Sequence, residues 1–176
     1  MKTLTAKRIF IGLAAAFVVV FGVQGAVFAQ ASVNLADDKL QTIRTRCSNS
    51  QFALQQIEKR DAVSRINRGR AYDQMLRQIS AFNSRFAYNK VNMPDLVQIT
   101  SDLQTAVNDF RSSYDTYDND ISSALKVDCK QDPSQYYGYI VQARNDRAAI
   151  GDKVKAINDL TTKYRDEITT YQETLK

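Results

Sequence analysis

The chain has only two cysteines, Cys47 and Cys129, and their chemistry is the most specific that the sequence offers. Residues 1–31, described below, have the features of an export signal, and an even cysteine count in an oxidising compartment outside the cell favours a disulfide. The midpoint of the two positions is residue 88, where a polar segment begins, so an antiparallel hairpin turning there would bring the cysteines side by side. The alternative is a buried pair of free thiols, and a metal site would need more ligands than two thiolates. We therefore predict a disulfide.

Catalytic and metal-binding side chains are scarce. The chain has no histidine, which excludes Ser–His–Asp and Cys–His catalysis and every histidine metal site. The acidic residues 115, 118 and 120 suggest a calcium loop. However, an EF-hand loop starting at Asp118 would have Ser123 where glycine is needed and Cys129 in place of the bidentate glutamate. We expect no metal, no cofactor and no enzymatic activity.

Positive charge is concentrated in one part of the chain. Residues 39–90 carry eleven basic and three acidic residues, whereas residues 91–135 carry three basic and eight acidic ones. One interpretation is that two neighbouring helices of opposite charge attract each other. The other is a basic stripe that binds a polyanion, such as DNA, an anionic wall polymer or lipid headgroups. The stripe would comprise Lys59, Arg60, Arg65, Arg68, Arg70, Arg77 and Arg85.

Two further clusters each have a structural and a functional interpretation. Tyr136, Tyr137 and Tyr139 either pack in the core at one end of the fold or form an exposed contact patch for a partner. The four consecutive charges from Glu58 to Asp61 cover a full helical turn, so at least one must face inward unless the helix kinks there. They would form a buried polar layer that fixes the register of the helices, or a binding site.

The elements that position these residues are predicted to be three helices. Pro94 and Pro133 are the only prolines, and each follows polar residues and suits the first turn of a helix. Apolar residues recur at helical spacing over residues 35–87, 94–126 and 133–175, and alternation at period two is nowhere sustained. We expect Asn34 to cap the first helix and Asp132 to cap the last.

The near-heptad spacing predicts an all-α fold, an elongated up-down-up three-helix bundle with coiled-coil-like packing. The apolar stripe of the first helix includes Ile66 and Phe82, and that of the last ends at Leu175. The stripe of the second helix comprises Leu96, Ile99, Leu103, Ala106, Phe110, Tyr114, Tyr117, Ile121 and Ala124. No linker or internal repeat is visible, so residues 32–176 are expected to form a single domain.

Residues 1–31 have the three parts of a secretory signal peptide. A basic start is followed by an uncharged apolar run over residues 9–23 and by cleavage positions after Ala29 or Ala31. If the segment is not cleaved, residues 9–29 are long enough to anchor the chain in a membrane. The formal charge of +5 includes three basic residues of this segment. The rest of the chain has a net charge of +2, which does not favour a nucleic-acid-binding protein.

The order of several sequence markers is similar to that of a known group of proteins. After the export signal come Arg46-Cys47, Phe86, Phe110, Tyr114, Tyr117, Asp128-Cys129, Tyr136 and Ala143-Arg144. In this layout the chain resembles small exported two-cysteine helical proteins from candidate-phyla bacteria with reduced genomes. The resemblance covers most of the chain after the signal, and its markers are sparse and non-catalytic. It implies a helical fold and export, and it assigns no activity and no functional residues.

The expected function is that of a non-enzymatic, exported helical bundle that acts through protein–protein contacts at the cell envelope. It would be an adaptor, a scaffold or a small chaperone. The alternative is a surface protein that binds a polyanion or an envelope polymer through the basic stripe. Salt distinguishes the two, because counterion release makes polyanion binding fall steeply with salt. The expected partner is an envelope protein, a membrane is expected only if the signal segment is uncleaved, and nucleic acid is not expected.

Overall fold

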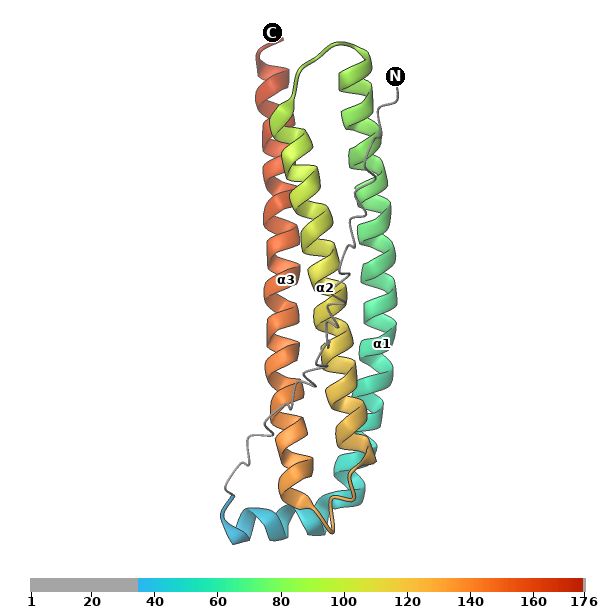
Figure 1. Cartoon of the computed structure of the whole chain (residues 1–176), viewed down its shortest axis with the longest axis vertical. Coiled ribbons are helices and arrows are strands. Elements are labelled where there is room, and N and C mark those ends of the chain that lie inside the picture. The colour runs from blue at the N-terminus through green and yellow to red at the C-terminus, as the bar shows by residue number, and fades with distance from the viewer. Residues whose placement is uncertain (1–34, 176) are drawn as a thin grey trace, which may run out of the picture.

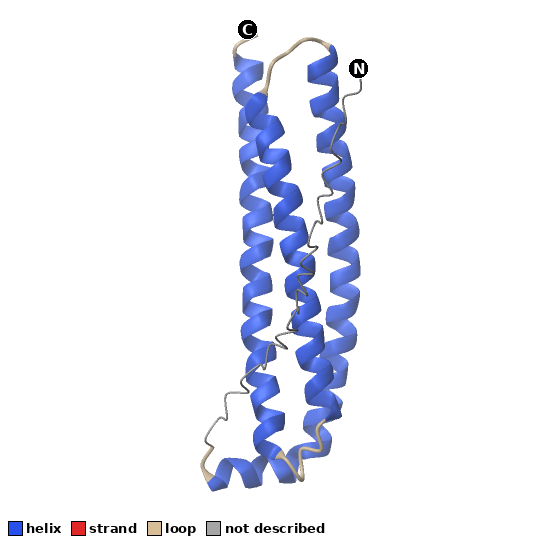
Figure 2. Cartoon of the chain, in the orientation of Figure 1, coloured by secondary structure: helices blue, strands red, loops and turns tan. Residues whose placement is uncertain are grey.

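The computed structural model describes residues 35–175, so the predicted signal peptide and Asn34 lie outside the described residues. The described chain forms three long helices, α1 (Asp37–Tyr88), α2 (Pro94–Lys126) and α3 (Pro133–Glu173). Residues 35–175 contain no strand (Figure 2). The prediction of an all-α fold with three packed helices is therefore confirmed.

The three helices lie along a common axis (Figure 1). The connection between α1 and α2 lies at one end of the bundle and that between α2 and α3 at the other, so consecutive helices run in opposite directions. The first turns of α1, drawn in blue, cross one end of the bundle before the helix continues along it. Helix α2 shares its most extensive interface with α3, whereas α1 and α3 meet at few places.

Local sequence explains where the helices begin. Pro94 and Pro133 occupy the first turns of α2 and α3, where the missing N–H removes no intrahelical hydrogen bond. As predicted, Asp132 caps α3, since its side chain accepts a hydrogen bond from the Gln135 backbone N–H at 3.4 Å. At the start of α1, the N-cap position is held by Ala36, which makes no side-chain hydrogen bond.

Helix α1 ends in a tight turn. Lys90 has a φ of 59°, in the left-handed region. The Val91 N–H donates to the Phe86 carbonyl at 2.9 Å, and the Lys90 N–H donates to the Ala87 carbonyl at 3.0 Å. This is the hydrogen-bond pattern of a Schellman motif, in which the left-handed position is usually glycine.

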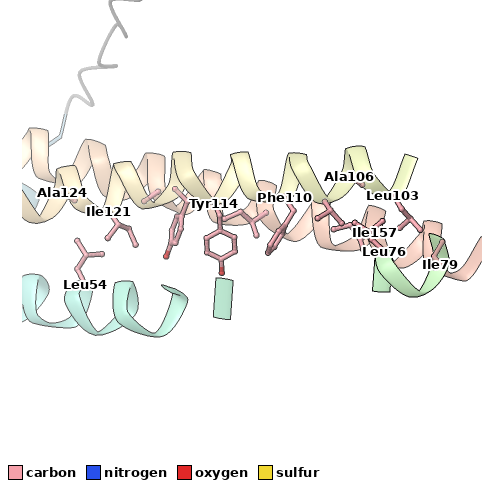
Figure 3. Close-up of a cluster of buried hydrophobic side chains, with 14 of the residues drawn as sticks. Leu54, Leu76, Ile79, Leu103, Ala106, Phe110, Tyr114, Ile121, Ala124 and Ile157 are labelled. Atoms are coloured by element: carbon pink, nitrogen blue, oxygen red, sulfur yellow. The ribbon is translucent and has the colours of Figure 1, made fainter. Parts of the chain in front are cut away.

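The core is built on α2. Every residue of its predicted apolar stripe is buried, from Leu96 to Ala124. Figure 3 shows side chains of this stripe directed towards α1 and α3. The Phe110 ring makes edge-on contacts with Tyr72 of α1 and with Tyr114, with ring centroids 5.1 Å and 5.2 Å apart. The strong periodicity of α2 thus follows from its position between two neighbours.

Three residues of the predicted apolar stripes are exposed, so the prediction that they lie in the core is wrong. Ile66 and Phe82 of α1 have exposed fractions of 51% and 48%, and Leu175 one of 68%. Helix α1 carries apolar side chains on more than one side, and only the side towards the other helices is buried. Leu175 follows the last residue of α3, Glu173, and so lies beyond the packed part of the helix.

Tyrosine hydroxyls connect α1 to the other two helices. One tyrosine from α2 and two from α3 form a hydrogen bond with a polar side chain of α1. The pairs are Tyr117 with Asp61, Tyr136 with Ser50, and Tyr164 with Asn83, at 2.5, 2.7 and 2.7 Å. Long rings make these links where few backbone segments of α1 approach α3. Each buried hydroxyl is satisfied by a specific residue of α1, which fixes its register.

Candidate functional sites

The two cysteines link α1 to the loop between α2 and α3. The sulfur atoms of Cys47 and Cys129 lie at bonding distance, and their Cα atoms are 5.5 Å apart, a separation that is usual for disulfides. Nearby, the Gln51 side chain donates a hydrogen bond to the Val127 carbonyl at 3.1 Å. The prediction that the two cysteines lie together at this end of the fold is confirmed.

The charged segment from Glu58 to Asp61 contributes a polar layer to the core. The Asp61 carboxylate is buried and accepts hydrogen bonds from the Tyr117 hydroxyl at 2.5 Å and from the Arg147 guanidinium at 3.2 Å. Burial and the hydrogen bond to Asp61 raise the pKa of Tyr117, so the hydroxyl remains a donor. Helix α1 continues through this segment. The buried-layer interpretation therefore describes this segment, and Asp61 is the residue that faces inward.

A second polar pair joins α2 and α3. The carboxyl group of Asp120 can hydrogen-bond with that of Asp146 when one of the two is protonated, and the Oδ2 atom of Asp146 is buried without a hydrogen-bond partner among residues 35–175. Burial, this hydrogen bond and the charge of Asp146 raise the pKa of Asp120 to about 6. Two carboxyl groups are too few to define a cation site. Within residues 35–175, no three His, Cys, Asp or Glu side chains gather as metal ligands.

In the sequence, Asp120 belongs only to a calcium-loop pattern whose ligand spacing does not fit, and nothing singles out Asp146 or Arg147. A weak signal was present, since Asp120 directly precedes Ile121 of the apolar stripe and so lies at its edge. Asp146 follows buried Ala143 by three residues, which puts it on the same side of α3. These positions indicate partial burial, but not which partner each carboxyl group would meet.

The structure divides the predicted basic stripe into two groups, of which the first faces the other helices. Arg65 forms ion pairs with Asp115 and, at 3.8 Å, with Asp118 of α2. Arg68 is exposed but close to Tyr114, where burial raises the pKa of the phenol and the Arg68 charge opposes this shift. Attraction between oppositely charged helices therefore explains the positive charge at position 65. It does not account for the remaining basic residues.

The second group lies on the side of α1 that faces away from the core. We define the outer face of α1 as Phe52, Lys59, Val63, Ile66, Arg70 and Arg77. Steps of seven, four, three, four and seven place these residues on one side of a helix. All six are exposed, and the three basic side chains form no hydrogen bond or ion pair with residues 35–175.

Two basic residues of the predicted stripe lie beside this face. Arg60 is exposed and, within the described part of the chain, has no ion-pair partner. The Arg85 guanidinium lies 5.8 Å from the centre of the Phe82 ring, within cation–π distance. The outer face itself contains no acidic residue, so its charge is uniformly positive.

The three tyrosines of the predicted contact patch have different positions. Tyr136 is 1% exposed and its hydroxyl is hydrogen-bonded to that of Ser50, so Tyr136 belongs to the core and not to an exposed patch. Tyr137 and Tyr139 are half-buried. The core interpretation thus describes Tyr136, because its side chain is buried in the same core cluster as the two cysteines.

Comparison with known proteins supplies no relative for these sites. The chain matches no protein family, and no curated protein or solved structure matches it. Over residues 35–175, none of the helices is both long and apolar enough to cross a membrane. The candidate sites therefore rest on the geometry described above.

Proposed function

We propose that this protein is a non-enzymatic, exported helical bundle that binds another protein at the cell envelope through the outer face of α1. It would be exported by a signal peptide cleaved after Ala29 or Ala31 and would act as an adaptor, a scaffold or a small chaperone. The observation that supports this proposal is the exposure of three large apolar side chains among unpaired cations on one helix face.

The composition of the outer face defines the chemistry of the partner. Exposed apolar side chains next to unpaired positive charges favour a partner that offers apolar and acidic side chains. The face extends over 26 residues from Phe52 to Arg77, about 38 Å of helix, which suits an amphipathic helix of the partner. A second copy of the chain fits less well, because a symmetric contact would bring the same basic residues together.

Site-specific crosslinking in the native cell tests the proposal. A photoreactive residue at Val63 should yield one defined adduct, and the same residue at exposed Ala149 on α3 should yield none. Adding Arg70→Glu and Arg77→Glu to the Val63 label should abolish the adduct. Adducts at both positions, or an adduct that survives the charge reversal, would contradict the proposed face.

The second candidate function is binding of a polyanion by the same basic residues. It is favoured by the absence of ion pairs at Lys59, Arg60, Arg70 and Arg77 within residues 35–175. Binding to an anionic polymer should then fall steeply with salt. Val63→Ser should leave such binding unchanged, whereas it should weaken a protein contact that buries this side chain.

A further inference from the structure

An apolar cleft lies between the three helices, near the cysteine-linked end of the bundle. It has a volume of about 280 Å³. Its apolar walls include Leu54 and Ile57 of α1, Ile121 of α2 and Ile140 of α3. Figure 3 shows Leu54 pointing across the space between the helices towards Ile121. The outer face of α1 does not contribute to this cleft, since the two lie on opposite sides of the helix.

Small residues explain why side chains do not fill the cleft. Each helix contributes an alanine to its lining: Ala53 from α1, Ala124 from α2 and Ala143 from α3. Protein interiors normally pack without such spaces, and larger side chains at these positions would close this one. In addition, the backbones of α1 and α3 approach each other at few places, and residues of both helices line the cleft.

Polar contacts bound the cleft at both ends. Ser50 lines one end, and its hydroxyl is hydrogen-bonded to that of Tyr136 at 2.7 Å. Tyr117 lines the other end and donates a hydrogen bond to Asp61 at 2.5 Å. Ser50 and Asp61 are eleven residues apart, which corresponds to about 16 Å along α1. The apolar part of the cleft therefore extends along the helices for at most about 16 Å. Such a shape suits an alkyl chain better than a ring system.

Two arginines of α3 give the rim of the cleft a positive charge. Arg144 and Arg147 are among its lining residues, and both side chains are exposed. Arg147 is paired with Asp61 at 3.2 Å, whereas Arg144 has no ion-pair partner within residues 35–175. No acidic residue lines the cleft. Arg144 is thus free to pair with an anionic group of a ligand whose apolar part occupies the cleft.

We propose that this cleft binds a single-chain amphiphile with an anionic headgroup, such as a fatty acid. The alkyl chain lies between the apolar walls, and the headgroup pairs with Arg144 at the opening. A volume of about 280 Å³ is at the lower end of ligand sites and is too small for a partner helix. The unpaired arginine excludes a cationic headgroup as the preferred ligand.

Calorimetric titration of the mature, oxidised protein with decanoate, below its micelle concentration, tests the proposal. We expect saturable binding of one decanoate per chain. Decyltrimethylammonium, which has a similar chain and the opposite charge, should bind at least tenfold more weakly. Absence of saturable decanoate binding, or equal affinity for the cationic amphiphile, would overturn the proposal.

Two variants and a matched control locate the site. Ala53 is exposed at the rim, so Ala53→Leu should fill the opening without disturbing the core and should weaken decanoate binding at least tenfold. Arg144→Gln should weaken decanoate at least threefold and leave binding of uncharged decanol unchanged. Arg165→Gln removes an exposed arginine of α3 that lies outside the cleft and should have no effect. Unchanged affinity in Ala53→Leu, or equal losses in Arg144→Gln and Arg165→Gln, would refute the site and leave the proposed function of the outer face untouched.

Discussion

Asp120 on α2 and Asp146 on α3 bring their carboxyl groups within hydrogen-bonding reach, and the bond forms only when one of the two holds a proton. Burial, this bond and the charge of Asp146 raise the pKa of Asp120 from 3.8 to about 6. The folded chain therefore holds this proton more tightly than the unfolded chain. The resulting stabilisation is complete below pH about 4 and is lost as the pH rises through about 6.

Replacing Asp120 with Asn should reduce this dependence on pH. The amide can donate to the Asp146 carboxylate without titrating, so the variant should gain melting temperature over the wild type as the pH rises from 4 to 7. Thermal unfolding followed by circular dichroism measures the difference at each pH. Asp166→Asn, at an exposed position of α3, is the control and should show a constant difference. A constant difference for Asp120→Asn as well would mean that the pair does not titrate in this range.

Asp61 and Tyr117 should be energetically coupled. Asp61→Ala leaves the Tyr117 hydroxyl buried without its acceptor, and we expect the free energy of unfolding to fall by about 1–3 kcal/mol. Tyr117→Phe should cost less, because it removes the buried donor. The double variant should lose less than the sum of the two single losses, which urea unfolding of all four proteins measures. Strictly additive losses would show that the two side chains act independently.

Helix bounds and the core of α2 were predictable because their signals are local. The observed helices begin and end within two residues of the positions predicted from proline, polar turns and apolar spacing. The stripe of α2 is regular because the helix packs against two neighbours. For α1 the same pattern was misleading, since apolar side chains such as Ile66 lie on its exposed side. Spacing alone does not show which apolar side of a helix meets a partner.

The candidate sites were predictable only where sequence spacing fixes a distance. The midpoint of Cys47 and Cys129 falls at a turn, so a hairpin was enough to bring them together. The run of four charges predicted that one residue faces inward, but Asp61 could be chosen only once Tyr117 was seen opposite it. Asp120 and Asp146 meet because of the rotation of α2 against α3, which no local pattern specifies.

The link between Cys47 and Cys129 should contribute much of the stability of the fold. The two residues are 82 positions apart, and the chain-entropy relation gives about 4–5 kcal/mol as an upper value for a crosslink of this length. Replacing both cysteines with serine should lower the free energy of unfolding by up to this amount. Ellman titration of the unfolded, non-reduced wild type should detect no free thiol. Two thiols per chain would refute the disulfide.

Lys90 should gain from replacement by glycine. Its φ of 59° is unfavourable for a residue with a side chain, by about 1–2 kcal/mol, while glycine adopts it freely. Allowing for the greater freedom of glycine in the unfolded chain, we expect Lys90→Gly to stabilise the fold by about 0.5–1 kcal/mol. Asn89, with a φ of −81°, is the matched control, and Asn89→Gly should destabilise. Destabilisation by Lys90→Gly, or equal stabilisation by both variants, would contradict strain at Lys90.

Arg65 and Arg70 lie on the same helix and differ in what they contact, so reversing their charges should separate structure from function. Arg65 pairs with Asp115 and Asp118, and Arg65→Glu should lower the free energy of unfolding by about 0.2–1 kcal/mol for each exposed pair. High salt should reduce this loss, because it screens both the original attraction and the new repulsion.

Arg70→Glu should instead leave the melting temperature unchanged, since Arg70 has no ion-pair partner within residues 35–175. Its effect should appear in binding, as loss of the crosslink formed from Val63. Both variants carry the same change of charge, so a purely long-range electrostatic effect would alter them equally. If Arg70→Glu lowered the melting temperature as much as Arg65→Glu and the crosslink persisted, Arg70 would have a structural role and the outer face would not be the binding surface.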